Sequence, residues 1–259
     1  MPATPVVFVS HGAPDALLKA DDALACWRQI AALVGEPRAI LAVSAHWQAR
    51  LPTASLSGAP ETLHDFSGFD PALYQLHYPA PGAPALAERA QALLAAAGIA
   101  ADLHPSRGLD HGAWVPLSVM YAQAGVPVSQ LSLAREGGPA AHLALGRALA
   151  PLRQEGVLIL ASGGITHNFA WLDGDADAED PAYAPAQAFA DWVAARLAQN
   201  DVAALLAYRD AAYGAASHPS EEHFLPLHVA LGAAGESPPR RFQPRFTYAA
   251  LAMDAYLWS

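Results

Sequence analysis

Short runs of consecutive hydrophobic residues alternate along the chain with longer stretches of helical spacing. Three runs rich in Val, Ile and Leu are continuous, as in strands buried on both faces: Val6–Ser10, Ile40–Ser44 and Val157–Ala161. Val126–Leu133 is a fourth candidate strand. Ala-rich stretches with helical spacing lie between them, at Ala85–Ala97 and Ala140–Leu152. Strands that alternate with helices predict an α/β fold with helices on the faces of a central sheet.

The last third of the chain has a different pattern. Ala186–Leu206 and Glu221–Ala234 have helical spacing, whereas Arg241–Tyr256 is typical of one or two closing strands. We therefore expect a mixed, mostly parallel sheet rather than a purely parallel one. No linker-like or repeated segment divides the sequence, so we interpret residues 1–259 as a single domain.

Composition narrows the possible partners. The net charge of −10 repels phosphate groups, so neither nucleic acid nor an anionic membrane is an expected partner. The single cysteine, Cys26, excludes an internal disulfide, and the N-terminus lacks the basic region of a secretory signal. No uncharged apolar run approaches the roughly 18 residues of a membrane span. The expected location is the cytoplasm, and the oligomeric state stays open.

Histidines follow three of the predicted strands. Of the eleven in the chain, His11, His46 and His167 come just after buried runs. Ligands bind at the carboxyl ends of the strands in open α/β sheets. A lone buried histidine is usually a hydrogen-bonded core residue. Three at equivalent positions instead indicate a metal or catalytic site, because a divalent metal needs convergent neutral imidazoles.

Other residues near these histidines have two interpretations each. His111 lies between Gly108 and Gly112, which we expect to let the backbone bend around Asp110 and His111. His64 and Asp65 either contact a substrate or form a turn. Trp47 and Trp114 either line an aromatic pocket or pack in the core. Glu221 and Glu222 lie near the predicted site in sequence, but acidic residues in the first turn of a helix commonly complement its dipole, and we favour this role for both.

Several common enzyme motifs are missing. Ser162-Gly163-Gly164 follows a strand but lacks the G-x-G-x-x-G spacing of a dinucleotide fold. No Walker A lysine is present. Ser10 and Ser44 lie near histidines, yet the G-x-S-x-G turn of a serine hydrolase is absent.

Seven motifs, in order along nearly the whole chain, resemble those of the class III extradiol ring-cleavage dioxygenases. The 4,5-DOPA dioxygenase-type branch is the most similar. The motifs are SHGAP at Ser10–Pro14, SAHW at Ser44–Trp47, HDFSGF at His64–Phe69, LYQLHYPAPG at Leu73–Gly82, GLDHGAWVPL at Gly108–Leu117, THN at Thr166–Asn168 and HPSEEHFLPL at His218–Leu227.

The resemblance implies a role for each matching histidine. His11, His46 and His223 correspond to the ligands of one divalent metal. His167 corresponds either to a further ligand or to the acid/base. His111 corresponds to a group that supports the ligands or faces the substrate, and with His167 it is a candidate catalytic residue that moves protons. The candidate substrate contacts are His64, Asp110 and Trp47.

The chain departs from the best-known relatives, which use two histidines and a glutamate. His223 stands at the third position with Glu222 beside it, and Glu221 replaces a frequent proline. An all-nitrogen site suits Zn²⁺ as well as Fe²⁺. The leading hypothesis is an Fe²⁺-dependent dioxygenase that opens a catechol ring with O₂. The alternatives are a zinc-dependent hydrolase or lyase and a non-enzymatic binding protein.

Overall fold

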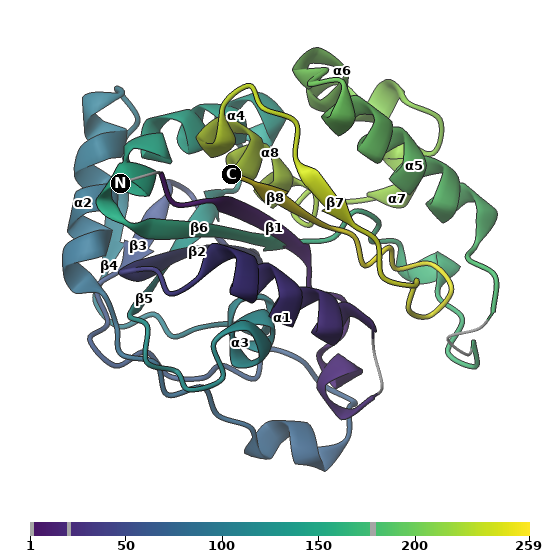
Figure 1. The fold of residues 1–259 in the computed structure, drawn as a ribbon, viewed down its shortest axis with the longest axis horizontal. Helices are drawn as coiled ribbons and strands as arrows, with labels where there is room; N and C mark the ends of the chain where they lie inside the picture. Colours follow the sequence, from purple (N-terminus) through teal and green to yellow (C-terminus); the bar gives the residue numbers. More distant parts are fainter. Residues whose placement is uncertain (1–2, 20–21, 177–179) are drawn as a thin grey trace.

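A single mixed sheet runs through the molecule in the computed structural model, which describes residues 3–19, 22–176 and 180–259 (Figure 1). Eight strands from these residues form it in the order β4-β3-β5-β2-β6-β1-β8-β7. The strands are β1 (Val6–Ser10), β2 (Ala39–Ala49), β3 (Thr53–Ser55), β4 (Asp102–His104), β5 (Val128–Ala134), β6 (Val157–Gly163), β7 (Arg240–Phe242) and β8 (Ala255–Trp258).

Helices flank this sheet. The α-helices are α1 (Asp22–Val34), α2 (Pro84–Ala96), α3 (His111–Met120), α4 (Gly138–Leu149), α5 (Ala184–Ala198), α6 (Val202–Leu206), α7 (Gly214–Ser217) and α8 (Leu225–Ala234). The 3₁₀-helices are η1 (Pro14–Leu18), η2 (Pro71–Gln75), η3 (Ala150–Glu155), η4 (Phe169–Trp171) and η5 (Tyr208–Asp210). Among the described residues, no helix has the length and apolar character needed to cross a membrane.

The predicted α/β fold with a mixed, mostly parallel sheet is confirmed. Parallel pairs join β1 to β6, β6 to β2 and β2 to β5 at the centre of the sheet. Antiparallel pairs lie toward the edges, where β8 pairs with β1, β7 with β8, and β3 with β5. The two closing strands predicted near the C-terminus are therefore β7 and β8.

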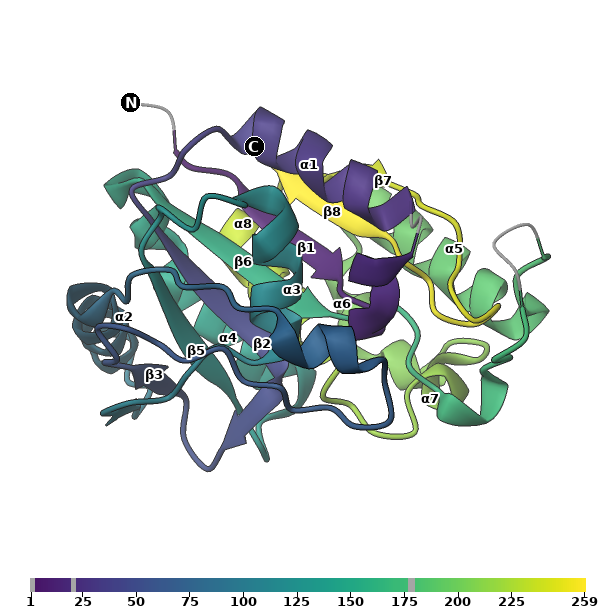
Figure 2. The ribbon, with the colours of Figure 1, turned by 90° about the horizontal axis from the view of Figure 1, so that it is seen from below.

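Both faces of the sheet are covered, which explains the continuous hydrophobic runs. Val6 and Phe8 of β1 join a cluster that includes side chains of α2, α4 and α8. Val7 and Val9 pack on the other face with Trp27 of α1 and the α3 helix. Figures 1 and 2 show α1 and α3 on one side of the sheet and α4 and α8 on the other. Residues at both alternating positions are thus buried.

The prediction of one long helix over Ala186–Leu206 is wrong. Two helices, α5 and α6, share this segment. Asn200 adopts a left-handed conformation with φ of 52°. Asp201 then caps α6 by accepting a hydrogen bond from the backbone N–H of Ala204. A left-handed residue followed by an N-cap ends one helix and begins the next.

The start of the last predicted helix is also wrong. α8 begins at Leu225 rather than Glu221, with Pro226 in its first turn, where a missing N–H costs no hydrogen bond. His223 therefore precedes the helix. Conversely, a helix that was not predicted, α3, begins at His111, where Asp110 is its N-cap. Pro116 inside α3 hides its helical character in the sequence.

Candidate metal centre

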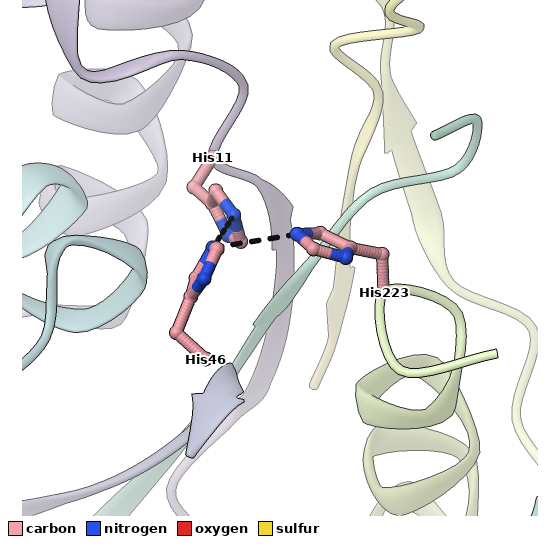
Figure 3. Close-up of side chains that lie close together, drawn as sticks. All are labelled: His11, His46 and His223. Carbon is pink, nitrogen blue, oxygen red and sulfur yellow. Dashed lines mark hydrogen bonds between the residues drawn. The ribbon is translucent and has the colours of Figure 1, made fainter. Parts of the chain in front are cut away.

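Three imidazole rings from distant parts of the chain meet at the carboxyl ends of the central strands (Figure 3). His11 directly follows β1, His46 lies in β2, and His223 lies in the turn before α8. The Nε2 atom of His46 is 3.0 Å from Nε2 of His11 and 3.3 Å from Nε2 of His223. Three ring nitrogens therefore face one small volume.

The partner of His11 determines which of its nitrogens carries the proton. The Ser162 hydroxyl donates to the Gly112 carbonyl oxygen. Since a hydroxyl has one proton, Ser162 Oγ accepts from the Nδ1 of His11, 2.9 Å away. The Nε2 of His11 therefore bears a lone pair.

A carboxylate plays the same part for His223, because Glu222 Oε1 accepts from its Nδ1 at 3.1 Å. Asp65 Oδ2 lies 3.7 Å from Nδ1 of His46, too far for a hydrogen bond. The Nε2 lone pairs of His11 and His223 thus face Nε2 of His46, and a cation between the three nitrogens would bind all of them. Nitrogens that are each about 2.1 Å from one metal ion are separated by roughly 3 Å. The donor set thus fits a single divalent metal.

Burial keeps these imidazoles neutral. It lowers the pKa of His11 and of His223 well below the usual value, and the neighbouring imidazoles add to the effect. Burial, followed by the nearby His111, lowers the pKa of His46 to about 3. Neutral imidazole is the form that binds a metal.

Backbone features bring the three rings together. The pairing of β2 with β5 shifts register between Val43 and Gln48, and His46 lies in this irregular stretch. A Cβ on Gly112 would lie 2.4 Å from Ser44 Oγ and 3.0 Å from the ring of His46. Glycine at this position therefore allows close packing of α3 against the site, which is a different role from the backbone bend expected from the sequence.

Gly163 has a similar function on the other side. A Cβ there would lie 2.2 Å from the carbonyl oxygen of His223, and the same oxygen accepts a hydrogen bond from the Gly164 N–H at 2.8 Å. The Ser162-Gly163-Gly164 segment thus holds two of the three histidines, through the Ser162 hydroxyl and through close backbone contact.

His111 lies against His46, with ring centroids 3.9 Å apart. Asp65 Oδ1 accepts both from its backbone N–H at 2.8 Å and from its Nδ1 at 3.0 Å. Although burial raises the pKa of Asp65, these hydrogen bonds with His111 outweigh it and hold the pKa at about 2. An ionised Asp65 fixes the proton of His111 on Nδ1 and leaves Nε2 as an acceptor.

His167 stacks face to face on His223, with centroids 3.4 Å apart and planes only 8° from parallel. It belongs to a group of potential ligands with Glu222 and His223, not to the group formed by His11, His46 and His223. Burial lowers its pKa.

A cavity of about 500 Å³ opens over these rings. All five histidines described above line it, together with Asp65 and apolar or aromatic side chains that include Phe66, Phe69, Phe169, Tyr248, Leu251 and Met253. Small-molecule sites have volumes of this order and similarly apolar walls.

The three candidate substrate contacts are not among the residues that line this cavity. His64 Nε2 donates to the Leu76 carbonyl oxygen at 3.0 Å. Asp110 is fully buried and caps α3. Trp47 is buried beside Arg107, whose guanidinium lies 5.3 Å from the ring centroid. The loop that carries His64 does reach the cavity, but through Asp65.

Some residues of the site differ from the sequence-based expectation or were not expected. Glu222 binds the neighbouring His223 through a hydrogen bond, whereas its position in the sequence favours a role in complementing a helix dipole. The sequence gives no signal for the role of Ser162, because its partner is 151 positions away. Tyr248 also lines the cavity, and none of the seven motifs includes it; Phe169, another lining residue, directly follows the THN motif but was not singled out.

A single-metal enzyme is the class of protein that this fold and donor set define. The family described as the catalytic LigB subunit of aromatic ring-opening dioxygenase matches residues 4–254, and the chain belongs to this family. A 4,5-DOPA dioxygenase extradiol from Beta vulgaris is 42% identical, with 89% of this chain and 87% of the relative aligned. A protein of the same name from Escherichia coli (strain K12) is 40% identical, with 88% and 84% aligned.

Solved structures agree with this assignment. The crystal structure of an uncharacterized protein from Escherichia coli K12 superposes with a TM-score of 0.83 and 35% sequence identity, covering 99% of this chain and 100% of that one. The prediction of a metal-dependent extradiol ring-cleaving dioxygenase is confirmed by the family and these relatives.

Proposed function

We propose that this protein is an Fe²⁺-dependent dioxygenase that opens the ring of a DOPA-like catechol, with His11, His46 and His223 as the metal ligands. The observation that carries the proposal is the convergence of three Nε2 atoms, with that of His46 3.0 and 3.3 Å from the other two, in a cavity of about 500 Å³. The relatives named as 4,5-DOPA dioxygenases support the substrate class.

The metal and the protein contribute different chemistry. Bound Fe²⁺ supplies electron transfer between a catechol and O₂, which Zn²⁺ cannot supply. The protein supplies a neutral ligand set, apolar walls for the ring and groups that move protons. Of the alternatives, a zinc-dependent hydrolase or lyase uses the same ligands, and no feature of the site favours it.

We assign His167 as an acid/base rather than a fourth ligand. Imidazole coordinates through a lone pair in its ring plane. Because the rings of His167 and His223 are stacked 3.4 Å apart and nearly parallel, their lone pairs lie in separate planes and would not converge on one ion. His167 lines the cavity, and its lowered pKa keeps it neutral and able to accept a proton near pH 7.

His111 is the second proton-transfer group in this proposal. Asp65 holds its Nδ1 proton, so the Nε2 lone pair is the one that can accept a proton from a catechol hydroxyl. As this nitrogen gains the proton, the carboxylate stabilises the resulting imidazolium. The phenyl rings of Phe66 and Phe169 line the same cavity and offer faces against which the catechol ring packs.

The test is O₂ consumption together with a visible absorbance scan. Protein loaded anaerobically with Fe²⁺, and a Zn²⁺ control, are each mixed with DOPA, protocatechuate and other catechols. Oxygen uptake with a yellow product in the iron sample alone supports the proposal. No uptake with any catechol, in protein shown to contain iron, would contradict it, and ester or carbonyl hydrolysis by the zinc sample would favour the alternative.

A further inference from the structure

The chain contains one lysine and thirteen arginines, and that lysine, Lys19, contacts Tyr248, a residue that lines the cavity. Lys19 directly follows η1, the 3₁₀-helix that begins at the cavity-lining Pro14. Its Nζ donates to the Tyr248 hydroxyl at 3.0 Å and lies 2.6 Å from Asp15 Oδ2. Tyr248 lines the cavity and itself donates to Asp15. These three side chains form what we call the rim triad.

The ammonium group of Lys19 in the rim triad has one N–H donor that neither Asp15 nor Tyr248 accepts. An ammonium group has three N–H donors, and Asp15 and Tyr248 accept two of them. Among the residues that the structure describes, no third side chain or carbonyl group accepts a hydrogen bond from Nζ, and the Lys19 side chain is 57% exposed. Burial lowers the pKa of Lys19, but the hydrogen bonds with Asp15 and Tyr248 outweigh it and raise the pKa above the usual value. The group is therefore a positive charge held in place beside the cavity.

The cavity walls themselves carry few charged side chains, so a cationic group next to them stands apart. The lining residues in the described ranges include no lysine or arginine, and the lining carboxylate, Asp65, is engaged by His111. The protein carries a net charge of −10, which disfavours the approach of an anionic ligand. Asp15 balances the charge of Lys19, so what the rim triad offers an anionic group is the remaining N–H donor of the ammonium.

Tyr248 is held rigidly in the triad. Tyr248 and Ala249 both have positive φ angles, 51° and 54°, which are costly for residues other than glycine. Backbone hydrogen bonds maintain this conformation, from the Asp173 N–H to the Tyr248 carbonyl at 3.1 Å and from Tyr183 to Ala249 at 2.7 Å. The hydroxyl that accepts from Lys19 thus has a fixed position.

We propose that Lys19, positioned by Asp15 and Tyr248, binds a carboxylate on the side chain of the catechol substrate and so selects carboxylate-bearing catechols over those that lack a carboxylate. This specificity role rests on the proposed function, because it concerns the substrate of the same cavity. The catechol hydroxyls lie toward the histidines in this arrangement, and the side chain points to the rim.

The first test compares DOPA with its methyl ester, which lacks the negative charge. The measured quantity is the preference, which is kcat/KM for DOPA divided by kcat/KM for the ester. Lys19→Gln is expected to lower this preference by about tenfold, because one charge-assisted hydrogen bond is lost. The change should arise mainly from a higher KM for DOPA. Lys19→Arg should keep most of the preference. Arg89→Gln, which removes a charge paired with Glu155 on the surface, is the matched control. An equal effect of Lys19→Gln on both substrates would overturn the proposal.

A second test does not depend on turnover. Because Lys19 is the sole lysine, reductive methylation followed by peptide mass spectrometry reports on it alone, with the α-amino group as an internal reference. In Zn²⁺-loaded protein, DOPA should slow methylation of Lys19 and the methyl ester should not. Absence of protection overturns the proposal. If ring cleavage fails for both substrates while DOPA still protects Lys19, the proposed function fails and the carboxylate site stands.

Discussion

The hydroxyl of Ser162 determines which nitrogen of His11 faces the metal centre. It accepts from Nδ1 of His11 and donates to the Gly112 carbonyl, so the ring has one orientation and one tautomer. Glu222 has the same effect on His223. Such partners of metal ligands fix the tautomer and the orientation of the ring and thereby increase metal affinity.

Ser162→Ala should therefore weaken metal binding by about 10- to 100-fold, because His11 loses the group that fixes its tautomer. Competition with a chromophoric zinc chelator measures the affinity. Ser129→Ala is the matched control, since Ser129 is a buried strand serine whose hydroxyl donates to Ser55 instead. Equal affinity in Ser162→Ala and the wild type would show that the tautomer is fixed by other groups.

Substitution of the histidines separates ligands from acid/base groups. His11→Ala and His46→Ala should lose the metal. His167→Ala should retain it but lose about 10²- to 10⁴-fold in kcat, the usual contribution of a general acid/base. Metal content after dialysis and kcat of the iron-loaded protein are the two measurements. Metal loss in His167→Ala equal to that in His11→Ala would make His167 a ligand.

At the scale of elements, α8 connects the site to the core. It packs closely against α4, because each helix has a glycine that faces the backbone of the other. A Cβ on Gly232 would lie 2.1 Å from the Leu143 carbonyl oxygen, and a Cβ on Gly146 would lie 2.1 Å from the Val229 carbonyl oxygen. His223 lies two residues before α8, so the close helix pair also determines where this ligand lies.

Gly232→Ala should destabilise the protein by about 1–3 kcal/mol, because the added methyl group forces the two helices apart. Urea unfolding followed by circular dichroism measures the loss. Gly125→Ala, where an added Cβ has no neighbour within 4 Å, is expected to change the stability little. An unaffected Gly232→Ala variant would mean that the helix pair relaxes without cost.

His228, in the middle of α8, makes stability depend on pH. Burial lowers its pKa to about 4 from the value of 6.5 expected in the unfolded chain. Between these values the unfolded state binds the proton more strongly, so stability is full above about pH 6.5 and falls as the pH drops toward 4, by about 1.4 kcal/mol for each pH unit.

His228→Gln should reduce this slope by the equivalent of one proton. Urea midpoints of the metal-free protein between pH 4 and 6.5 measure it, and His104→Gln, at an exposed position, is the control for loss of an imidazole. The same slope in His228→Gln and wild type would assign the proton uptake to other groups.

At the scale of the whole molecule, the metal centre joins segments that are far apart in sequence. Its three proposed ligands come from the residue after the first strand, from the second strand and from the turn before the last α-helix of the described chain. The unfolded chain does not bring them together, so a metal that binds them stabilises only the folded state.

Zn²⁺ at about 100 times its Kd should stabilise chelator-treated protein by about 2.7 kcal/mol and raise Tm. Differential scanning fluorimetry detects the shift. Mg²⁺, which prefers oxygen ligands, should have little effect. In His46→Ala, Zn²⁺ should no longer raise Tm, and a persistent shift would point to a different metal site.

The sequence by itself determined the four central strands and the histidines at their carboxyl ends, because a strand buried on both faces requires a continuous hydrophobic run. Seven motifs in order also identified the family. Only the tertiary structure decided the hydrogen-bond partners of those histidines, the separation of His167 from the three-nitrogen group and the position of Lys19 beside Tyr248. These contacts join residues up to 229 positions apart, and the order of strands in the sheet brings them together, which local spacing does not encode.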